Sequence, residues 1–135
     1  MIMVDTNVII DVVARDPVWF DWSRVRLNAA VVEDQVVINE AVYAELAAGY
    51  PRYQALDAFL SRAGLELVRT PRSALYVAGK VFQRHRAAGG IRTGVLPDFF
   101  IGAHAMISGS QLITRDVQRY RAYFPGLELI SPDPS

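Results

Sequence analysis

Short apolar runs alternate with longer mixed stretches along the chain. The runs at 1–4, 35–39, 65–68, 111–113 and 127–130 have the length and composition of buried strands. The stretches between them predict helices at 6–14, 17–30, 40–48, 52–63, 72–88, 98–108 and 116–123, several of which stop near Gly or Pro. Strands that alternate with helices favour a parallel sheet covered on both faces. We therefore expect a three-layer α/β/α fold with a four- to five-stranded parallel sheet.

Length and composition limit the kind of protein further. A chain of 135 residues, without internal repeats or a linker, is expected to form one domain over 1–135. It has no cysteine, which excludes disulfides and thiolate metal sites. Its formal net charge is zero, so a polyanion would need a local basic patch. The chain begins without a signal-peptide pattern and has no stretch of membrane-spanning length, which favours a cytoplasmic protein without a membrane partner.

Two acids lie at or shortly after the ends of apolar runs that are predicted to be strands. Asp5 ends the first run, and Asp116 comes shortly after the fourth. Parallel strands align their carboxyl ends at one edge of the sheet, so both acids are expected at that edge, and close together if the two strands are neighbours. Asp98 and Glu45 lie on predicted apolar helices, among small residues that let a helix approach the sheet closely. The pattern therefore allows all four acids to point at one place.

Four carboxylates at one place are costly without a cation. Two carboxylates about 5 Å apart repel by roughly 3 kcal/mol at an effective dielectric constant near 20. Several such pairs rival the stability of a whole domain. Oxygen-only ligands favour Mg²⁺ or Mn²⁺, and these ions activate a water for phosphodiester hydrolysis. Taken singly, each acid has another explanation, because the three aspartates sit where helix caps are favoured and the glutamate can lie on a solvent face.

Four blocks of the sequence resemble the PIN domain family, and in particular the VapC-type toxins of prokaryotic toxin–antitoxin pairs. The blocks occur in the family's order and spacing over nearly the whole chain. They are Val4-Asp5-Thr6-Asn7-Val8, the segment 40–46 with its Tyr43-Ala44-Glu45-Leu46, Pro97-Asp98-Phe99-Phe100-Ile101-Gly102-Ala103, and Ile113-Thr114-Arg115-Asp116.

The resemblance implies a PIN-like fold and an endoribonuclease that depends on Mg²⁺ or Mn²⁺. It implies that catalysis and metal binding rest on the four acids Asp5, Glu45, Asp98 and Asp116. It also implies three supporting residues that hold the acids through hydroxyl or amide hydrogen bonds, namely Thr6, Asn7 and Thr114. The implied partners are an RNA substrate, a cognate antitoxin protein and a second copy in a homodimer. Whether Glu45 or Asp116 assists deprotonation of the water stays open.

Basic residues near the acids are candidates for holding RNA phosphates. Arg86 and Arg92 flank a Gly-Gly loop ahead of the third acid, and Arg115 directly precedes the fourth. A basic loop beside an acidic site suits a polyanion. For the first pair, a solvated helix end is an equally good explanation, because cations are favoured at the C-terminus of a helix.

Three large rings fall within four residues of the second predicted helix. Trp19, Phe20 and Trp22 cannot all face one core, so at least one is expected to meet solvent or a partner. In the VapC-type toxins this region helps to receive the C-terminal segment of the antitoxin, which makes Trp19 and Trp22 candidate partner-binding residues. The alternative is core packing for two rings and partial burial for the third. Tyr50 and Tyr53 are candidates for a dimer interface.

Three other functions stay open on the sequence alone. An acid after the first strand also suits a haloacid-dehalogenase-like phosphohydrolase, but that family needs a second Asp where this chain has Asn7. It also needs a site lysine, and Lys80 lies in the middle of a predicted helix. A non-catalytic PIN binding module is disfavoured by the presence of all four acids. A housekeeping PIN-domain nuclease that processes RNA uses the same acids as a toxin.

Overall fold

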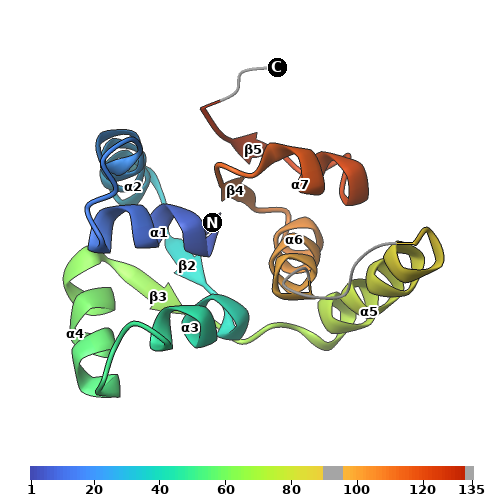
Figure 1. Cartoon of the computed structure of the whole chain (residues 1–135), viewed down its shortest axis with the longest axis horizontal. Coiled ribbons are helices and arrows are strands. Elements are labelled where there is room, and N and C mark those ends of the chain that lie inside the picture. Colours follow the sequence, from blue (N-terminus) through green and yellow to red (C-terminus); the bar gives the residue numbers. More distant parts are fainter. Residues whose placement is uncertain (90–95, 133–135) are drawn as a thin grey trace.

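A five-stranded parallel sheet forms the centre of the molecule (Figure 1). The computed structural model describes residues 1–89 and 96–132. The strands are β1 (Ile2–Val4), β2 (Val36–Ile38), β3 (Leu65–Leu67), β4 (Gln111–Ile113) and β5 (Leu129–Ile130). Their order is β3-β2-β1-β4-β5, and every neighbouring pair is parallel. The predicted sheet is thus confirmed with five strands, and β1 and β4 are neighbours.

Seven helices connect the strands within the described residues. They are α1 (Thr6–Val13), α2 (Phe20–Glu33), α3 (Glu40–Ala47), α4 (Tyr53–Ala63), α5 (Arg72–Ala87), α6 (Leu96–Ser108) and α7 (Val117–Tyr123). Six of them match the predicted helices closely. No helix in residues 1–89 or 96–132 combines the length and apolar character that a membrane span requires.

The start of α2 differs from the prediction, which placed Pro17 in its first turn. The helix begins three residues later, at Phe20. The reason is a local turn, because the Asp16 side chain accepts hydrogen bonds from the backbone N–H groups of Val18 and Trp19 at 2.9 Å. A side chain that takes up these N–H groups gives the backbone an alternative to the helix.

The helices cover both faces of the sheet and complete the three layers. Successive residues of a strand point to opposite faces, yet all three residues of β1 are buried, as are all three of β2. The two central strands are therefore shielded on both sides. On one side of the molecule α5 packs against α6, and on the other α1 packs against α2 (Figure 1).

A glycine lets α6 pack closely against the C-terminal part of the chain. An added Cβ at Gly102 would lie 2.5 Å from Cε2 of Phe124, a distance that real contacts do not reach. Phe124 is buried, so its ring has little room to yield. Gly102 thus allows α6 to approach the residue that ends α7.

A candidate acidic active site

The carboxyl ends of β1 and β4 bring two of the predicted acids to one edge of the sheet. Asp5 follows β1 and is the N-cap of α1, where its Oδ1 accepts the N–H of Thr6 at 2.8 Å. Asp116 follows β4 as the N-cap residue of α7 and makes no side-chain cap bond. The strands are tied together at this point, because the backbone N–H of Asp5 donates to the carbonyl of Ile113 at 2.9 Å. Asp5 therefore serves both as a helix cap and as a member of the site.

Asp5 is a buried carboxylate held by several donors. It is 3% exposed. Its Oδ2 accepts the hydroxyl of Thr114 at 2.7 Å and the phenol of Tyr120 at 3.1 Å, and the amide of Asn7 lies 3.4 Å away. Burial raises the pKa of Asp5 to about 7, and the negative charge of Asp98 adds to that rise against the lowering effect of the donors. The raised pKa means that the ionised form of Asp5 is unfavourable here, and a nearby cation would stabilise it.

The three supporting residues predicted from the resemblance all contact the acids or their connections. Thr114 donates to Asp5 and also accepts the N–H of Asp116 at 3.0 Å, so one hydroxyl links both strand-end acids. Thr6 donates its hydroxyl to Oε1 of Glu45 at 2.7 Å, which fixes an otherwise exposed side chain of α3. The amide oxygen of Asn7 lies 3.5 Å from the backbone nitrogen of Arg115, at the loop after β4.

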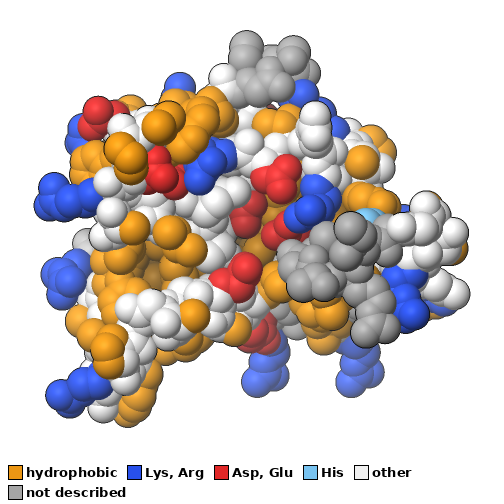
Figure 2. All heavy atoms as spheres, viewed as in Figure 1, with side chains coloured by type: hydrophobic (Ala, Val, Ile, Leu, Met, Phe, Trp, Pro, Cys, Tyr) orange, Lys and Arg blue, Asp and Glu red, His pale blue; other side chains and the backbone are white. Residues whose placement is uncertain are grey.

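Asp98 lies on the first turn of α6, partly buried, and faces the other acids. Burial raises its pKa, the neighbouring charges of Glu45 and Asp116 raise it further, and Arg119 opposes them. The structure therefore places Asp98 within electrostatic reach of each of the other three predicted acids. Figure 2 shows Asp and Glu side chains gathered around a hollow near the centre of one face, with a basic side chain against them.

Arg119, which the sequence analysis did not select as a site residue, contacts two of these acids. Its guanidinium Nη1 contacts Oδ2 of Asp98 and lies 3.7 Å from Oδ2 of Asp116. The spacing of three residues between Asp116 and Arg119 on a helix was a usable signal for the second contact. The contact with Asp98 joins α7 to α6 and had no signal in the sequence.

The carboxylate oxygens of the four acids suit a hard divalent cation, although the acids do not surround a common point. All candidate ligands are carboxylate oxygens, which Mg²⁺ and Mn²⁺ prefer. Two of them have a raised pKa because burial and like charges disfavour ionisation. In residues 1–89 and 96–132, however, no three acidic or histidine side chains are close enough to hold one ion between them. An ion held by three of these acids would require their side chains to move closer together.

Arg115, a predicted RNA-binding residue, has its guanidinium turned to a different partner. Its Nε and Nη2 donate to the two carboxylate oxygens of Asp11 at 2.7 and 2.9 Å. Asp11 is buried on α1 and also accepts the hydroxyl of Ser23 at 2.7 Å. The guanidinium carbon lies 5.1 Å from the centre of the Trp19 ring. Sequence reasoning missed Asp11, because nothing in its local pattern indicates a partner 104 residues away.

The other predicted RNA-binding and partner-binding residues that the structure describes are Arg86, Trp19 and Trp22. Arg86 is exposed near the end of α5, with its guanidinium carbon 5.9 Å from the Phe82 ring centre, and Arg92 lies outside the described residues. Trp19 and Trp22 are half-buried and meet edge-to-face with ring centres 6.3 Å apart. The ring of Trp22 packs against the core, so the aromatic cluster is shared between core and surface.

An apolar groove begins beside Glu45. It has a volume of about 440 Å³ and runs between α1 and the end of α3, lined mainly by apolar residues: Ile10, Val13, Ala14, Leu46, Ala48 and Tyr50. Two of these, Ile10 and Val13, are 46% and 43% exposed. Glu45 belongs to this groove and to the acidic cluster at the same time. The groove therefore joins an apolar surface to one of the four acids, Glu45.

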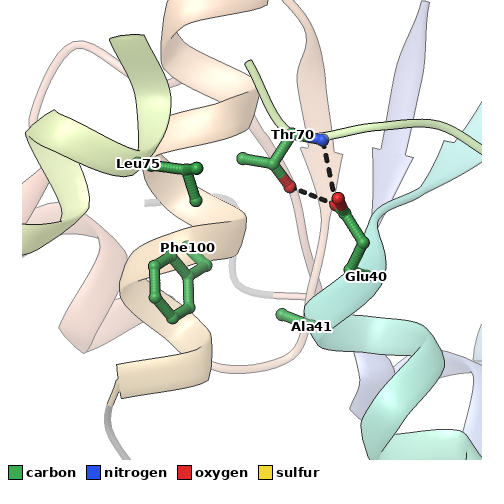
Figure 3. A pocket seen from close by; sticks show the side chains of 5 residues that line it. All are labelled: Glu40, Ala41, Thr70, Leu75 and Phe100. Carbon is green, nitrogen blue, oxygen red and sulfur yellow. Dashed lines mark hydrogen bonds between the residues drawn. The ribbon is translucent and has the colours of Figure 1, made fainter. Parts of the chain in front are cut away.

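A second hollow, of about 270 Å³, lies between the start of α3 and α6 and involves none of the four acids (Figure 3). At its edge the carboxylate of Glu40 accepts the backbone N–H of Thr70 at 2.9 Å and also the Thr70 hydroxyl. Behind it, Nδ2 of Asn39 lies 3.2 Å from Nδ1 of the buried His104, and burial lowers the pKa of His104. These polar groups therefore already pair with one another.

Comparisons with known proteins agree with this architecture. The chain is similar to VapBC2 from Rickettsia felis bound to a promoter DNA fragment, with 24% identity and a TM-score of 0.75 over 98% of this chain and 100% of that chain. It is similar to DNA-bound VapBC from Salmonella typhimurium, with 21% identity and a TM-score of 0.71 over 97% and 98% of the two chains. It is also similar to VapBC-1 from nontypeable Haemophilus influenzae, with 25% identity and a TM-score of 0.69 over 97% of this chain and 98% of that chain.

A comparison with curated protein sequences gives no significant match. Among family models, that of the PIN domain matches residues 2–125. This match covers nearly the whole chain and includes all four acids at the end of the sheet. The chain therefore belongs to the PIN domain family.

Proposed function

We propose that this protein is a metal-dependent endoribonuclease and acts as the VapC-type toxin of a toxin–antitoxin pair. The observation that carries the proposal is that Asp98 of a PIN domain lies within electrostatic reach of three further carboxylates, those of Asp5, Glu45 and Asp116. PIN domains generally use divalent metal ions. The solved neighbours are toxin–antitoxin complexes, and this supports a cognate antitoxin as the partner.

The ion would be held by carboxylate oxygens of Asp5, Asp98, Asp116 and Glu45. When bound, it would supply a water of lowered pKa and positive charge for the phosphate. The chain's own contribution is position. Thr114 and Tyr120 fix the carboxylate of Asp5, and Thr6 fixes that of Glu45. Glu45 is exposed and Asp116 is half-buried, so solvent reaches both, and either suits the role of base.

Two alternatives from the same family differ in what they would do with RNA and with a partner. A housekeeping RNA-processing nuclease would cleave RNA but would not have a dedicated antitoxin. A non-catalytic PIN module would bind a partner without cleaving RNA. A short antitoxin gene beside this one favours the toxin, and its absence favours the processing enzyme.

Cleavage of total cellular RNA, with mapping of the cut sites, tests the enzymatic part. We expect cleavage with Mg²⁺ or Mn²⁺ and none in chelator. Glu45→Gln should abolish it, because the substitution removes one charge from the cluster while keeping the size of the side chain. Glu33→Gln, which neutralises an exposed acid on α2, is the matched control and should cleave as the parent does. Metal-independent cleavage, or full activity of Glu45→Gln, would contradict the proposal.

Metal binding has its own readout in the folded state. At a concentration 100 times its dissociation constant, an ion that binds only the folded protein stabilises it by about 2.7 kcal/mol. We therefore expect millimolar Mn²⁺ to raise the melting temperature of the parent, and calorimetric titration to detect binding. A flat titration together with an unchanged melting temperature would rule out the metal site.

The antitoxin would approach through the apolar groove next to Glu45, since exposed apolar patches tend to be interaction sites. A basic side chain of the antitoxin would then meet the acids, because carboxylates bind a guanidinium well. Trp19 and Trp22 stay proposed as contacts at the other side of α1, and Tyr53, which is 67% exposed, stays proposed for a homodimer.

Substitutions in the groove test this placement. Ile10→Asp introduces a charge into the groove and should weaken binding of the co-encoded antitoxin by at least about tenfold, as loss of an apolar anchor does. RNA cleavage by the free protein should stay near the parental rate. Val32→Asp on α2 is the matched control, because Val32 is also exposed and lies outside the groove. If Trp19→Ala and Trp22→Ala weaken binding while Ile10→Asp does not, the interface lies on the aromatic cluster.

A further inference from the structure

The side chain of Arg119 supplies a positive charge within the acidic cluster. The guanidinium of Arg119 contacts Asp98 and lies 3.7 Å from Oδ2 of Asp116. It reaches these acids from α7, while Asp98 comes from α6 and Asp116 from the connection after β4. The side chain is 32% exposed, so the guanidinium lies at the mouth of the site with a path to solvent.

These contacts bear directly on metal binding. A carboxylate oxygen engaged by a guanidinium is not available to a metal ion in the same direction. Arg119 touches or borders two of the four acids, and no three acids of the described chain surround a single point. A guanidinium does not lose its proton at any accessible pH, so it can leave the acids only by moving away.

We propose that Arg119 is an internal competitor of the divalent cation, which has to displace it from Asp98 and Asp116 in order to bind. This inference rests on the proposed function, since it concerns the same four acids. Without a divalent ion Arg119 stabilises the cluster, and with one it moves to solvent. The exchange replaces one cation by another and breaks no covalent bond. Arg119 therefore weakens metal affinity in exchange for a more stable ion-free fold.

If Arg119 competes with the ion, removing its charge should strengthen Mn²⁺ binding and at the same time lower the stability of the ion-free protein. A ligand shifts an equilibrium only by its different affinity for the two arrangements, so removing Arg119 should favour the arrangement with metal. Arg119→Gln should therefore bind Mn²⁺ more tightly than the parent, by about fivefold or more, the lower end of typical coupling between two ligands. The same variant should melt at a lower temperature in chelator, because two acids lose their counter-charge. A residue that merely braces the structure would lower the melting temperature without tightening Mn²⁺ binding.

Mn²⁺ titration calorimetry and melting in chelator are run on the full chain and three variants. Arg119→Lys keeps the charge but lacks the two-armed guanidinium, and should show an affinity between those of the parent and Arg119→Gln. Arg62→Gln removes the same charge from the exposed face of α4 and should match the parent in both measurements. If Arg119→Gln unfolds at the working temperature, Arg119→Lys by itself still has to bind Mn²⁺ more tightly than the parent.

The outcomes separate this inference from the proposed function. If the parent binds no Mn²⁺, the metal site fails, and the competition fails with it. If the parent binds Mn²⁺ and Arg119→Gln binds it equally or more weakly, only the competition is overturned. In that case Arg119 positions the acids for the ion. An equal gain in affinity for Arg62→Gln would also overturn it, because the effect would then come from net charge.

Discussion

Asp5 shows how one residue serves the fold and the site with opposite demands. As the cap of α1 and the acceptor for Thr114 and Tyr120, it is well bonded. As a carboxyl that is almost fully buried, it is costly to ionise, and its pKa is raised from 3.8 to about 7. A pKa higher in the folded state than in the unfolded state means that the folded protein holds this proton more tightly. The resulting stability is present below about pH 4 and is lost as the pH rises to about 7.

Asp5→Asn is predicted to change stability with opposite signs at low and high pH. In chelator at about pH 8, the variant should be more stable than the parent, because it carries no buried charge at this position. Ionisation of Asp5 lowers the parent's free energy of unfolding by roughly 3 kcal/mol between about pH 5 and pH 7. At about pH 5 it should be less stable, because the amide cannot accept all the hydrogen bonds that the carboxyl accepts. Thermal melting at both pH values measures the change.

The same substitution should abolish RNA cleavage at either pH. Asp21→Asn, on the exposed face of α2, is the control and should follow the parent across the pH range. A variant that is less stable than the parent at both pH values would show that Asp5 is mainly a structural cap, and that repulsion within the acid cluster is small.

At the scale of elements, the Asp11–Arg115 pair fastens α1 and α2 to the connection that carries Thr114 and Asp116. Asp11 is buried on α1, accepts a hydroxyl from α2 and receives both arms of the guanidinium. Removing one partner of a buried pair is expensive, because the other charge stays buried without compensation. This placement makes Arg115 a positioning residue for the site, in addition to its proposed role near RNA.

Arg115→Ala is predicted to lower the free energy of unfolding by roughly 3–5 kcal/mol, as breaking a buried ion pair does. Urea unfolding followed by circular dichroism measures it. Arg24→Ala breaks a pair of exposed side chains on α2 and should cost far less. If Arg115→Ala is as stable as the parent and only its RNA binding is reduced, then the guanidinium acts on phosphate and not on the fold.

At the scale of the whole molecule, the distribution of charge matters more than its sum. The formal net charge is zero, so long-range attraction to RNA is weak and binding has to come from local contacts. The acids gather at the end of the sheet, while Arg86 lies exposed near the C-terminal end of α5, shortly before the segment that leads into α6. Under the proposed function, RNA would be repelled by the acids, so exposed arginines such as Arg86 would be needed to attract its phosphates.

Arg86→Ala combined with Arg92→Ala is predicted to weaken RNA binding and to flatten its dependence on salt. Each lost phosphate contact should reduce the slope of the logarithmic plot by roughly 0.7 for single-stranded RNA. Binding is measured in chelator, where the RNA stays intact. Lys80→Ala, which removes an exposed charge from the same helix, is the control and should leave the slope unchanged. An unchanged slope for the double variant would assign both arginines to the solvated helix end.

Much of the architecture and part of the site could be predicted because they depend on local or repeating patterns. Two apolar runs, each followed by an acid, predicted β1 with Asp5 and β4 with Asp116. Because β1 and β4 are parallel neighbours, both acids lie at the same edge of the sheet. The start of α2 was missed by three residues, because Asp16 takes up two N–H groups that the helix would otherwise use. The sites of the supporting hydroxyls followed from resemblance, and the structure shows which atoms they contact.

The sequence by itself determined the order of the elements, the parallel sheet and the edge at which the acids meet, because hydrophobic periodicity and strand direction act over a few residues. Only the tertiary structure decided which side chains pair there. Arg119 reaches Asp98 across two helices, Tyr120 donates to Asp5 over a separation of 115 residues, and Arg115 turns to a buried acid on α1. Such pairs depend on the packing distance and rotation of whole elements, which arise from the sum of all core contacts and from no local pattern.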